Sequence, residues 1–374
     1  MRSFRLLAAV AAFVSVSLLS SATGFAAAPV RVTDFEKLAG WESDDQAEAL
    51  DAFRRSCTRI MKLDPGAPLD ATSGKGIYGV AKDWQAPCEQ ATAVRSSRGA
   101  ARAFFERWFV PVVFTQDNTG LFTGYYEPEY RGALKRGGVY QTPILGVPSN
   151  YVAGKPFYTR TQIENGAVDA DRNAIVWLAD PVDAFFLHIQ GSGRIRLEGG
   201  KTMRLGFAAK NNRPYTAIGK VLLQKGELKQ GEVSMQTIRA WLDAHPAEQQ
   251  KILHTNDSYV FFRQLADVSS ELGPIGAEAV NLTPGRSLAV DRSFHPLGSL
   301  MWLDASAVPV PFRDGVNSPS RRLVVAQDTG TAIVGRQRGD VFWGAGPEAA
   351  DIAGRMQSPG TLTALVPRSA LNRR

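Results

Sequence analysis

Apolar residues follow a helical spacing in the first part of the chain. They recur at every third or fourth position between residues 50 and 60, which predicts a helix preceded by Ser43 and Gln46 as a capping pair. A second amphipathic stretch, "RGAARAFFERWF" at 98–109, predicts another helix that stops before Pro111. The N-terminal region is therefore expected to be helical.

The spacing becomes strand-like after residue 110. The segment 184–207, "AFFLHIQGSGRIRLEGGKTMRLGF", is predicted as strands separated by Gly-rich turns, and helical patterns follow at 214–226 and 235–246. Short apolar runs then return, among them "TAIVG" at 331–335. Short strands separated by Gly and Pro turns favour a small β-barrel over a doubly wound sheet.

Residues 1–28 have the composition of a secretory signal peptide. Arg2 and Arg5 precede an apolar run of about 14 residues, and small residues follow it. The run is shorter than the ~20 residues that a membrane-spanning helix needs. This segment also contains no cysteine that could carry a lipid. The mature protein is therefore expected to be exported without a lipid anchor.

Charge and cysteine content narrow the functional classes. The chain has 43 basic and 36 acidic side chains, and loss of the two leader arginines leaves a net charge of +5. This mild excess suits an anionic polymer, and no basic run is dense enough to indicate nucleic-acid binding. The four histidines are scattered, so neither a metal nor a cofactor is expected. Cys57 and Cys88, the two cysteines, favour a disulfide in an exported protein, with a reduced buried pair as the alternative.

The triplet Asp328-Thr329-Gly330 follows an apolar strand-like run, as does the catalytic triplet of an aspartic protease. That chemistry needs two Asp residues in close contact, and the sequence contains one such triplet. Gln327 also stands where an apolar residue is usual. A protease acting through Asp328 is therefore a disfavoured alternative.

Asp328 is one of three acids that flank strand-like segments in the last third of the chain. Asp291 follows "SLAV" and Asp340 precedes "VFWG". Turn chemistry explains each acid taken singly, but the three can converge on one pocket.

These three acidic segments together resemble the three-aspartate (3D) domain of the type A lytic murein transglycosylases. The resemblance covers most of the chain from about residue 120 to 355, with the family's segments in the family's order. The other matching segments are "FTGYYEPEY" (122–130), "LHIQGSGRIRL" (187–197), "FAAKNNRPYTAIGKVLLQKGEL" (207–228), "SMQTIRAWL" (234–242), "NDSYVFF" (256–262) and "GAGPEAADIAG" (344–354). Each segment alone is weak, but their succession is specific.

The resemblance implies a mainly β fold with helices. A double-psi β-barrel domain would carry an inserted, smaller β-rich domain, with the substrate groove between them. The expected parts are the signal peptide at 1–28, the N-terminal helices and first barrel segment at 29–127, the inserted domain at 128–258 and the C-terminal 3D part of the barrel at 259–374.

The resemblance also implies roles for individual residues. By the family pattern, Asp340 is the catalytic acid and base, Asp328 supports it in catalysis, and Asp291 is a supporting acid on the substrate side. The residues that match substrate-contacting segments of the groove are Tyr125, Tyr126, Gln190, Gly191, Ser192 and Gly193.

The implied reaction cleaves the β-1,4 bond between N-acetylmuramic acid and N-acetylglucosamine without water and leaves 1,6-anhydromuramoyl ends. One carboxyl acts as acid and then as base, so its pKa must be raised. An apolar wall of Phe342 and Trp343, with the charge of Asp328 nearby, is expected to raise this pKa. Arg336 and Arg338 are expected to face solvent or the substrate.

Peptidoglycan glycan strands are the expected partner of a monomeric protein, with wall-synthesis or wall-remodelling proteins as further candidates. The expected location is the periplasm. Many relatives are lipoproteins, whereas this leader lacks the lipobox cysteine, so only a peripheral association with the outer membrane is left open. The alternative of a different class is a non-catalytic peptidoglycan-binding module, which would bind glycan but release no product.

Overall fold

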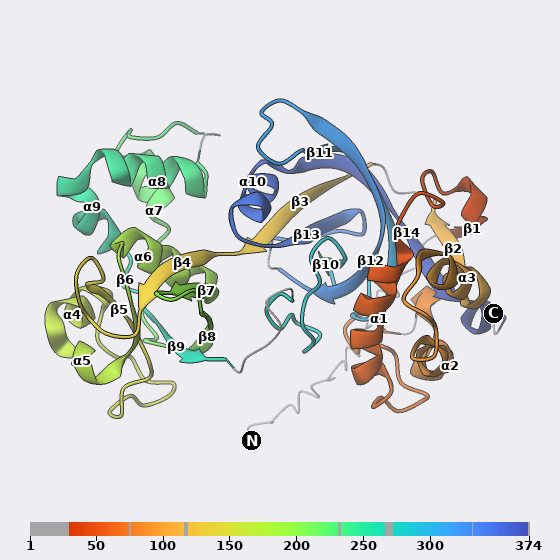
Figure 1. Cartoon of the computed structure of the whole chain (residues 1–374), viewed down its shortest axis with the longest axis horizontal. Helices are drawn as coiled ribbons and strands as arrows, with labels where there is room; N and C mark the ends of the chain where they lie inside the picture. The colour runs from red at the N-terminus through yellow and green to blue at the C-terminus, as the bar shows by residue number, and fades with distance from the viewer. Residues whose placement is uncertain are drawn as a thin grey trace, which may run out of the picture.

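The structure, a computed structural model, describes residues 30–74, 76–115, 119–230, 233–265, 272–330 and 332–372. The expected signal peptide at 1–28 lies outside the described residues. Figure 1 shows two lobes joined by two crossings of the chain. No helix within the described residues is long and apolar enough to cross a membrane.

One lobe contains a closed β-barrel. Its six strands are β3 (Gly120–Glu127), β10 (Ser287–Val290), β11 (Leu300–Pro309), β12 (Asn317–Asp328), β13 (Arg338–Ala345) and β14 (Gln357–Pro367). They pair in the order β14, β11, β12, β10, β13 and β3, and β3 pairs with β14 to close the barrel. The pairs β10–β12 and β13–β3 are parallel. Two further strands, β1 (Val30–Val32) and β2 (Phe109–Phe114), extend the sheet beyond β14.

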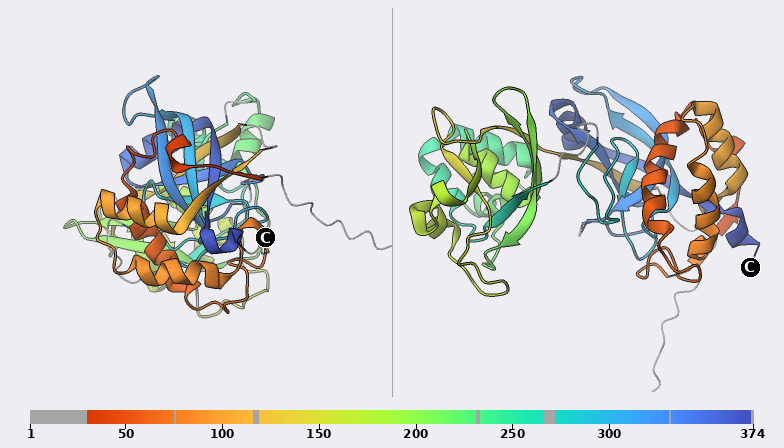
Figure 2. Two further views of the ribbon diagram at one scale, coloured as in Figure 1. Left: turned by 90° about the vertical axis from the view of Figure 1, so that its right-hand side faces the viewer. Right: turned by 60° about the horizontal axis from the view of Figure 1, so that its bottom comes forward.

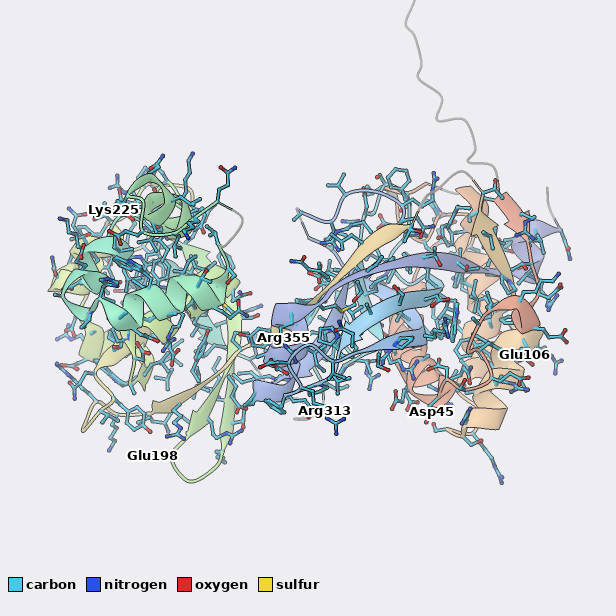
Figure 3. The ribbon with its side chains drawn as sticks, turned by 90° about the horizontal axis from the view of Figure 1, so that it is seen from above. Asp45, Glu106, Glu198, Lys225, Arg313 and Arg355 are labelled. Atoms are coloured by element: carbon cyan, nitrogen blue, oxygen red, sulfur yellow. A yellow bond between two sulfur atoms is a disulfide. The ribbon has the colours of Figure 1, made fainter. Side chains whose placement is uncertain are left out.

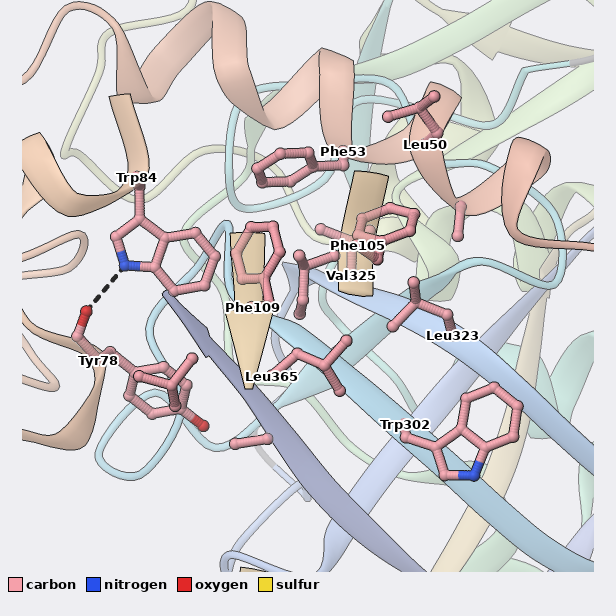
Figure 4. Packing of buried hydrophobic residues seen from close by; sticks show 14 of the residues in the cluster. Leu50, Phe53, Tyr78, Trp84, Phe105, Phe109, Trp302, Leu323, Val325 and Leu365 are labelled. Atoms are coloured by element: carbon pink, nitrogen blue, oxygen red, sulfur yellow. Dashed lines mark hydrogen bonds between the residues drawn. The ribbon is translucent and has the colours of Figure 1, made fainter. Parts of the chain in front are cut away.

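The barrel strands are apolar on both faces because successive side chains of a strand point to opposite sides. Val324 of β12 belongs to the cluster inside the barrel, whereas Val325 belongs to a cluster shared with helices outside. The covering helices are η1 (Phe35–Lys37), α1 (Gln46–Ile60), η2 (Gly76–Tyr78), α2 (Ala81–Ala91), α3 (Arg98–Trp108) and α11 (Arg368–Leu371). Figure 4 shows Phe53 and Phe105 of these helices beside Val325 and Leu365. Helix α10 (Pro347–Arg355), also in this lobe, packs on β3 and β13 instead.

The two predicted N-terminal helices are confirmed as α1 and α3. The predicted cap is wrong: Asp45 precedes α1 and accepts a hydrogen bond from the Ala47 N–H, while the side chain of Gln46 donates to a backbone carbonyl. Helix α2 lies where the pattern predicted no element. A disulfide joins Cys57 of α1 to Cys88 of α2, with the Cα atoms 5.3 Å apart.

The other lobe contains a six-stranded sheet in the order β5, β6, β4, β7, β8 and β9. These strands are β4 (Glu129–Ala133), β5 (Thr142–Leu145), β6 (Ala174–Leu178), β7 (Ser192–Leu197), β8 (Thr202–Lys210) and β9 (Val260–Gln264). The helices are α4 (Arg160–Gln162), η3 (Ile163–Ala167), α5 (Ala170–Asn173), α6 (Pro181–Gln190), α7 (Ile218–Gln224), α8 (Met235–Ala244) and α9 (Pro246–Leu253). Figure 2 shows this lobe on one side of the barrel and helices α1 to α3 on the other. The mainly β fold with helices, comprising a barrel and a second sheet, is confirmed.

Three sequence expectations are corrected here. Residues 184–190, predicted as strand, belong to helix α6, which Asp180 caps and which ends at Gly191 in a left-handed conformation (φ +75°). The "TAIVG" run is not a strand, because its described part, 332–335, consists of turns and coil. Strand β9 pairs with β8, so the second sheet continues past the expected domain limit at residue 258. The reason is that Phe261 and Phe262 are buried in the apolar clusters of that lobe. The other domain limits stay predictions.

Candidate active site

A cavity of about 770 Å³ lies between the barrel and the second sheet. Strands β3, β12 and β13 line it on the barrel side, and the end of α6 with parts of β7, β8 and β9 lines the opposite side. Asp328 and Asp340 are on the barrel wall. Phe207, which is half exposed, and Arg263 are on the opposite wall. The cavity therefore places two carboxyls in front of an aromatic and a cationic side chain.

Asp340 is held by the neighbouring strand. The parallel register of β13 and β3 puts Asp340 opposite Thr123, whose hydroxyl donates to Asp340 Oδ1 at 2.8 Å. Arg338 Nη2 donates to the same Thr123 oxygen at 2.9 Å. Because Thr123 accepts from Arg338, its own hydroxyl hydrogen is directed at Asp340. Among the hydrogen bonds of the described residues, none involves Asp340 Oδ2, which leaves that oxygen available to a ligand.

The surroundings of Asp340 favour its protonated form. Burial is the largest effect and raises the pKa of Asp340, and the nearby charge of Asp328 adds to it. The hydrogen bond from Thr123 and the charge of Arg338 act in the opposite direction without reversing the rise in pKa. Phe342, two residues along the strand, lines the same cavity. The carboxyl is thus prepared to donate a proton at a higher pH than an ordinary Asp.

Two expectations about this neighbourhood are wrong. Trp343 is not part of the wall, because alternation along β13 turns it away from the cavity, where its Nε1 contacts Met356 Sδ at 3.3 Å. Arg338 points inward to Thr123 rather than to solvent. Arg336 packs over an aromatic ring, with its Cζ 4.8 Å from the ring centre of Phe294.

Asp328 stands at the end of β12 and accepts three hydrogen bonds. Tyr125 donates its hydroxyl to Oδ2 at 2.8 Å, and the N–H groups of Ala277 and Thr329 donate to Oδ1 at 3.0 and 2.9 Å. Burial, and then the charge of Asp328, raise the pKa of Tyr125 well above its ordinary value, so the hydroxyl keeps its proton. Among the described residues no hydrogen bond joins Asp328 to Asp340, so the arrangement differs from the shared-proton pair of an aspartic protease.

The other expected site residues fall into two groups. Tyr125, Tyr126, Gln190, Gly191 and Ser192 line the cavity, whereas Gly193 and Asp291 are not among its lining residues. Gly193 is buried, and a Cβ there would come within 2.7 Å of Leu187 Cδ1.

Asp291 acts on the backbone. Its Oδ2 accepts from the N–H of Gly335 at 2.8 Å, and its Oδ1 accepts from the N–H of Ser293 at 3.0 Å. Burial acts to raise the pKa of Asp291, but these hydrogen bonds outweigh it and lower the pKa. Asp291 therefore holds the loop whose residues Ala332 and Ile333 form the edge of the cavity.

Comparisons with known proteins identify the family and support the fold. The domain family described as "MltA specific insert domain" matches residues 121–263, and the family described as "3D domain" matches residues 286–366. The structure of MltA from Neisseria gonorrhoeae is 30% identical in sequence, and the match covers 92% of each chain with a TM-score of 0.75. This chain belongs to the MltA family.

Relatives from two other organisms are similar to this chain over different shares of its length. The lytic transglycosylase LtgG of Burkholderia pseudomallei is 39% identical, and the match covers 92% of this chain and 96% of that one with a TM-score of 0.65. The membrane-bound lytic murein transglycosylase A of Escherichia coli is 37% identical over 64% of each chain, slightly less than two thirds of that curated relative. A structure of E. coli MltA with bound chitohexaose matches with 30% identity, covering 85% of this chain and 90% of that one with a TM-score of 0.60.

Two further residues, Thr123 and Glu127, contribute to this MltA-family site and were not predicted from the sequence. Both lie on β3 at even spacing from Tyr125, so all three side chains share one face of the strand. Alternation around Tyr125 was the signal that could have indicated them. No cluster of three or more His, Cys, Asp or Glu able to hold a metal occurs within the described part of the chain.

Proposed function

We propose that this chain is a lytic transglycosylase that cleaves peptidoglycan glycan strands in the cavity between the barrel and the second sheet. The observation that carries the proposal is Asp340, which lines the cavity with one oxygen held by Thr123 and a raised pKa. Membership of the MltA family supports the activity. The chitohexaose in the E. coli relative supports a β-1,4-linked aminosugar strand as the ligand.

The proposed reaction uses one carboxyl twice. Asp340 Oδ2 donates its proton to the glycosidic oxygen that leaves with N-acetylglucosamine, and the bond to the anomeric carbon of N-acetylmuramic acid breaks. The resulting carboxylate then takes the proton of the 6-hydroxyl of the same muramoyl residue. That oxygen closes on the anomeric carbon and forms a 1,6-anhydro ring. Asp340 ends protonated, and no water is consumed.

The neighbours of Asp340 fit this cycle. Thr123 fixes Oδ1, so the proton to be transferred is carried by Oδ2. Asp328 supplies a negative charge that stabilises the oxocarbenium-like transition state and favours the protonated form of Asp340. Tyr125 holds Asp328 in place, and its ring centre lies 5.3 Å from that of Phe342. These two rings form the apolar side of the acid's environment. We place this activity in the periplasm, in a monomer that has lost residues 1–28, with wall-synthesis or wall-remodelling proteins as candidate partners.

The decisive experiment is mass spectrometry of the products released from purified sacculi. Anhydro-ended muropeptides are the expected result. Products with reducing ends would indicate a hydrolase, and binding of the protein to sacculi without soluble product would indicate a binding module. The Asp340→Asn variant serves as the inactive control.

A further inference from the structure

Three side chains on one face of β3 each hold a different part of the site. Thr123 and Tyr125 contact the two acids, as described above. Glu127 is the third, and it is buried, with 2% of its surface exposed. Its partners come from the opposite lobe: Arg194 Nε of β7 lies 2.7 Å and Arg204 Nη2 of β8 lies 3.3 Å from Glu127 Oε2. The strand that holds both acids is therefore tied to the sheet that forms the far wall.

The same two arginines bind the chain where it returns to the barrel. Arg194 Nη2 donates to the carbonyl of Leu272 at 2.7 Å, and Arg204 donates to the carbonyls of Leu272 and Gly273. The backbone N–H of Arg194 also donates to the carbonyl of Pro128, which stands between β3 and β4, at 2.8 Å. Both crossings between the lobes are thus fixed at one point. We call Glu127, Arg194 and Arg204 the interlobe clamp.

We propose that the residues of the interlobe clamp are positioning residues that set the width of the groove, so that a glycan strand contacts both walls at once. The acids and their hydrogen-bond donors all belong to the barrel lobe. The wall at Gln190 to Ser192 and Phe207 belongs to the other lobe. A strand lying in the cavity must bridge the two, and only the spacing of the lobes determines whether it can do so. The catalytic consequence rests on the function proposed above, whereas the structural role does not.

The energetics of the interlobe clamp favour a geometric role over a purely stabilising one. Arg194 and Arg204 are both buried. Taking such charges out of water costs several kcal/mol per ion, so well-packed apolar residues of similar volume stabilise a protein equally well or better. Apolar contacts are not directional, whereas guanidinium groups fix the positions of the carboxylate and carbonyl oxygens that they bind.

The chain offers a matched control on the same strand. Arg196 of β7 forms an ion pair with Glu129 of β4. The Arg196 side chain is 60% exposed, and its ion-pair partner lies in its own lobe. Loss of this pair removes one arginine from β7 and leaves the crossings untouched.

The test uses Arg204→Gln, which keeps one arginine paired with Glu127 and so leaves the buried charges balanced. Spin labels are attached through Glu198→Cys in the turn after β7 and Arg313→Cys in the turn after β11. Both positions are exposed and lie in different lobes (Figure 3). We expect Arg204→Gln to broaden the distribution of label distances. We also expect it to raise KM for sacculi about tenfold while kcat stays within about twofold. Arg204→Lys should lie between Arg204→Gln and the unsubstituted protein in both the label distances and KM. Arg196→Gln should match the unsubstituted protein in both.

An unchanged distance distribution in folded Arg204→Gln would overturn the proposal, as would a broadened distribution with an unchanged KM. If melting curves show that Arg204→Gln does not fold, the same two measurements on Arg204→Lys decide the matter, with a result equal to the unsubstituted protein counting against the clamp. If the unsubstituted protein does not cleave sacculi, the proposed function fails, and the label distances alone decide whether the interlobe clamp sets the spacing of the lobes.

Discussion

Replacing Asp340 by Asn separates proton transfer from every other property of the site. The amide is nearly isosteric with the carboxyl, and its oxygen can still accept the 2.8 Å hydrogen bond from Thr123. The amide nitrogen then takes the place of Oδ2, facing the ligand. It can neither donate an acid proton to the leaving oxygen nor remove one from the 6-hydroxyl. Binding and folding should survive, whereas both chemical steps lose their catalyst.

The expected size of the loss follows from the double use of this carboxyl. One general acid or base contributes about 10² to 10⁴ in rate. Because Asp340 supplies both transfers in the proposed reaction, turnover should fall by at least about 10⁴, which corresponds to ~5.4 kcal/mol of activation free energy. Stability should change in the other direction. A buried carboxyl with a raised pKa is most favourable to folding when protonated, and this contribution is lost as pH rises through its pKa in the folded protein. The Asn variant should therefore be the more stable protein at pH 8, with the advantage absent at pH 3.

The assay is the release of soluble muropeptides from purified sacculi by the Asp340→Asn and Asp328→Asn variants, with urea unfolding at the two pH values alongside. Asp328→Asn should be the milder change, because it removes a supporting charge and not the proton carrier. The reasoning is refuted if Asp340→Asn keeps more than a tenth of the turnover while folded Asp328→Asn has none. In that case the acid would be the Asp of the Asp-Thr-Gly triplet.

Three other changes probe the surroundings of the site and the scaffold. Thr123→Val removes a hydrogen bond that lowers the pKa of Asp340, so the basic limb of the pH profile of kcat/KM should move to higher pH. A basic limb that stays in place or moves to lower pH would contradict the role of Asp340 as the acid. Asp291→Asn should lower the free energy of unfolding at pH 7 and lower it less at pH 3, because the lowered pKa of Asp291 gives stability that declines once pH falls below its ordinary pKa and is lost below its pKa in the folded protein. Equal losses at both pH values in urea unfolding would argue against this role. Reduction of the Cys57–Cys88 disulfide, whose cysteines are 31 positions apart, should cost about 3 to 4 kcal/mol on the chain-entropy model; two reactive thiols in the denatured, unreduced protein would show that the bond does not form.

The apolar spacing in the sequence predicted helices most accurately where only one face of the helix is buried. The spacing in α1 and α3 identified both helices, because each presents one apolar face to the barrel. Helix α6 was read as a strand because it is buried on opposite sides, with Leu187 against the sheet and Phe185 against α7 to α9. Such a helix has no polar stripe to reveal its period.

The site shows a similar division. Asp328 and Asp340 could be named from their motifs and the family resemblance, but their partners depend on register. The pairing of Thr123 with Asp340 spans 217 positions, and nothing local to either residue indicates it. The same strand pairing directs the Arg338 side chain inward to Thr123. The opposite placement of Phe342 and Trp343 was open to prediction, because alternation along a strand separates neighbours. The shared face of Thr123, Tyr125 and Glu127 was open to prediction for the same reason.

The closure of the barrel has a consequence for the order in which the chain can become functional. Strand β3 carries the donors for both acids, yet its barrel partners β13 and β14 come from the last part of the sequence, after the whole second sheet. A growing or truncated chain that ends before residue 338 contains the groove's far wall and the strand that will support Asp340, but not Asp340 itself. Because the ends of the intervening segment are joined at Glu127 and Leu272 by the same arginine, folding of that segment shortens the loop that β3 must close and lowers its entropic cost. In the proposed reaction the proton donor is therefore complete only when the last part of the chain is present, and a chain that ends earlier should release no product from sacculi.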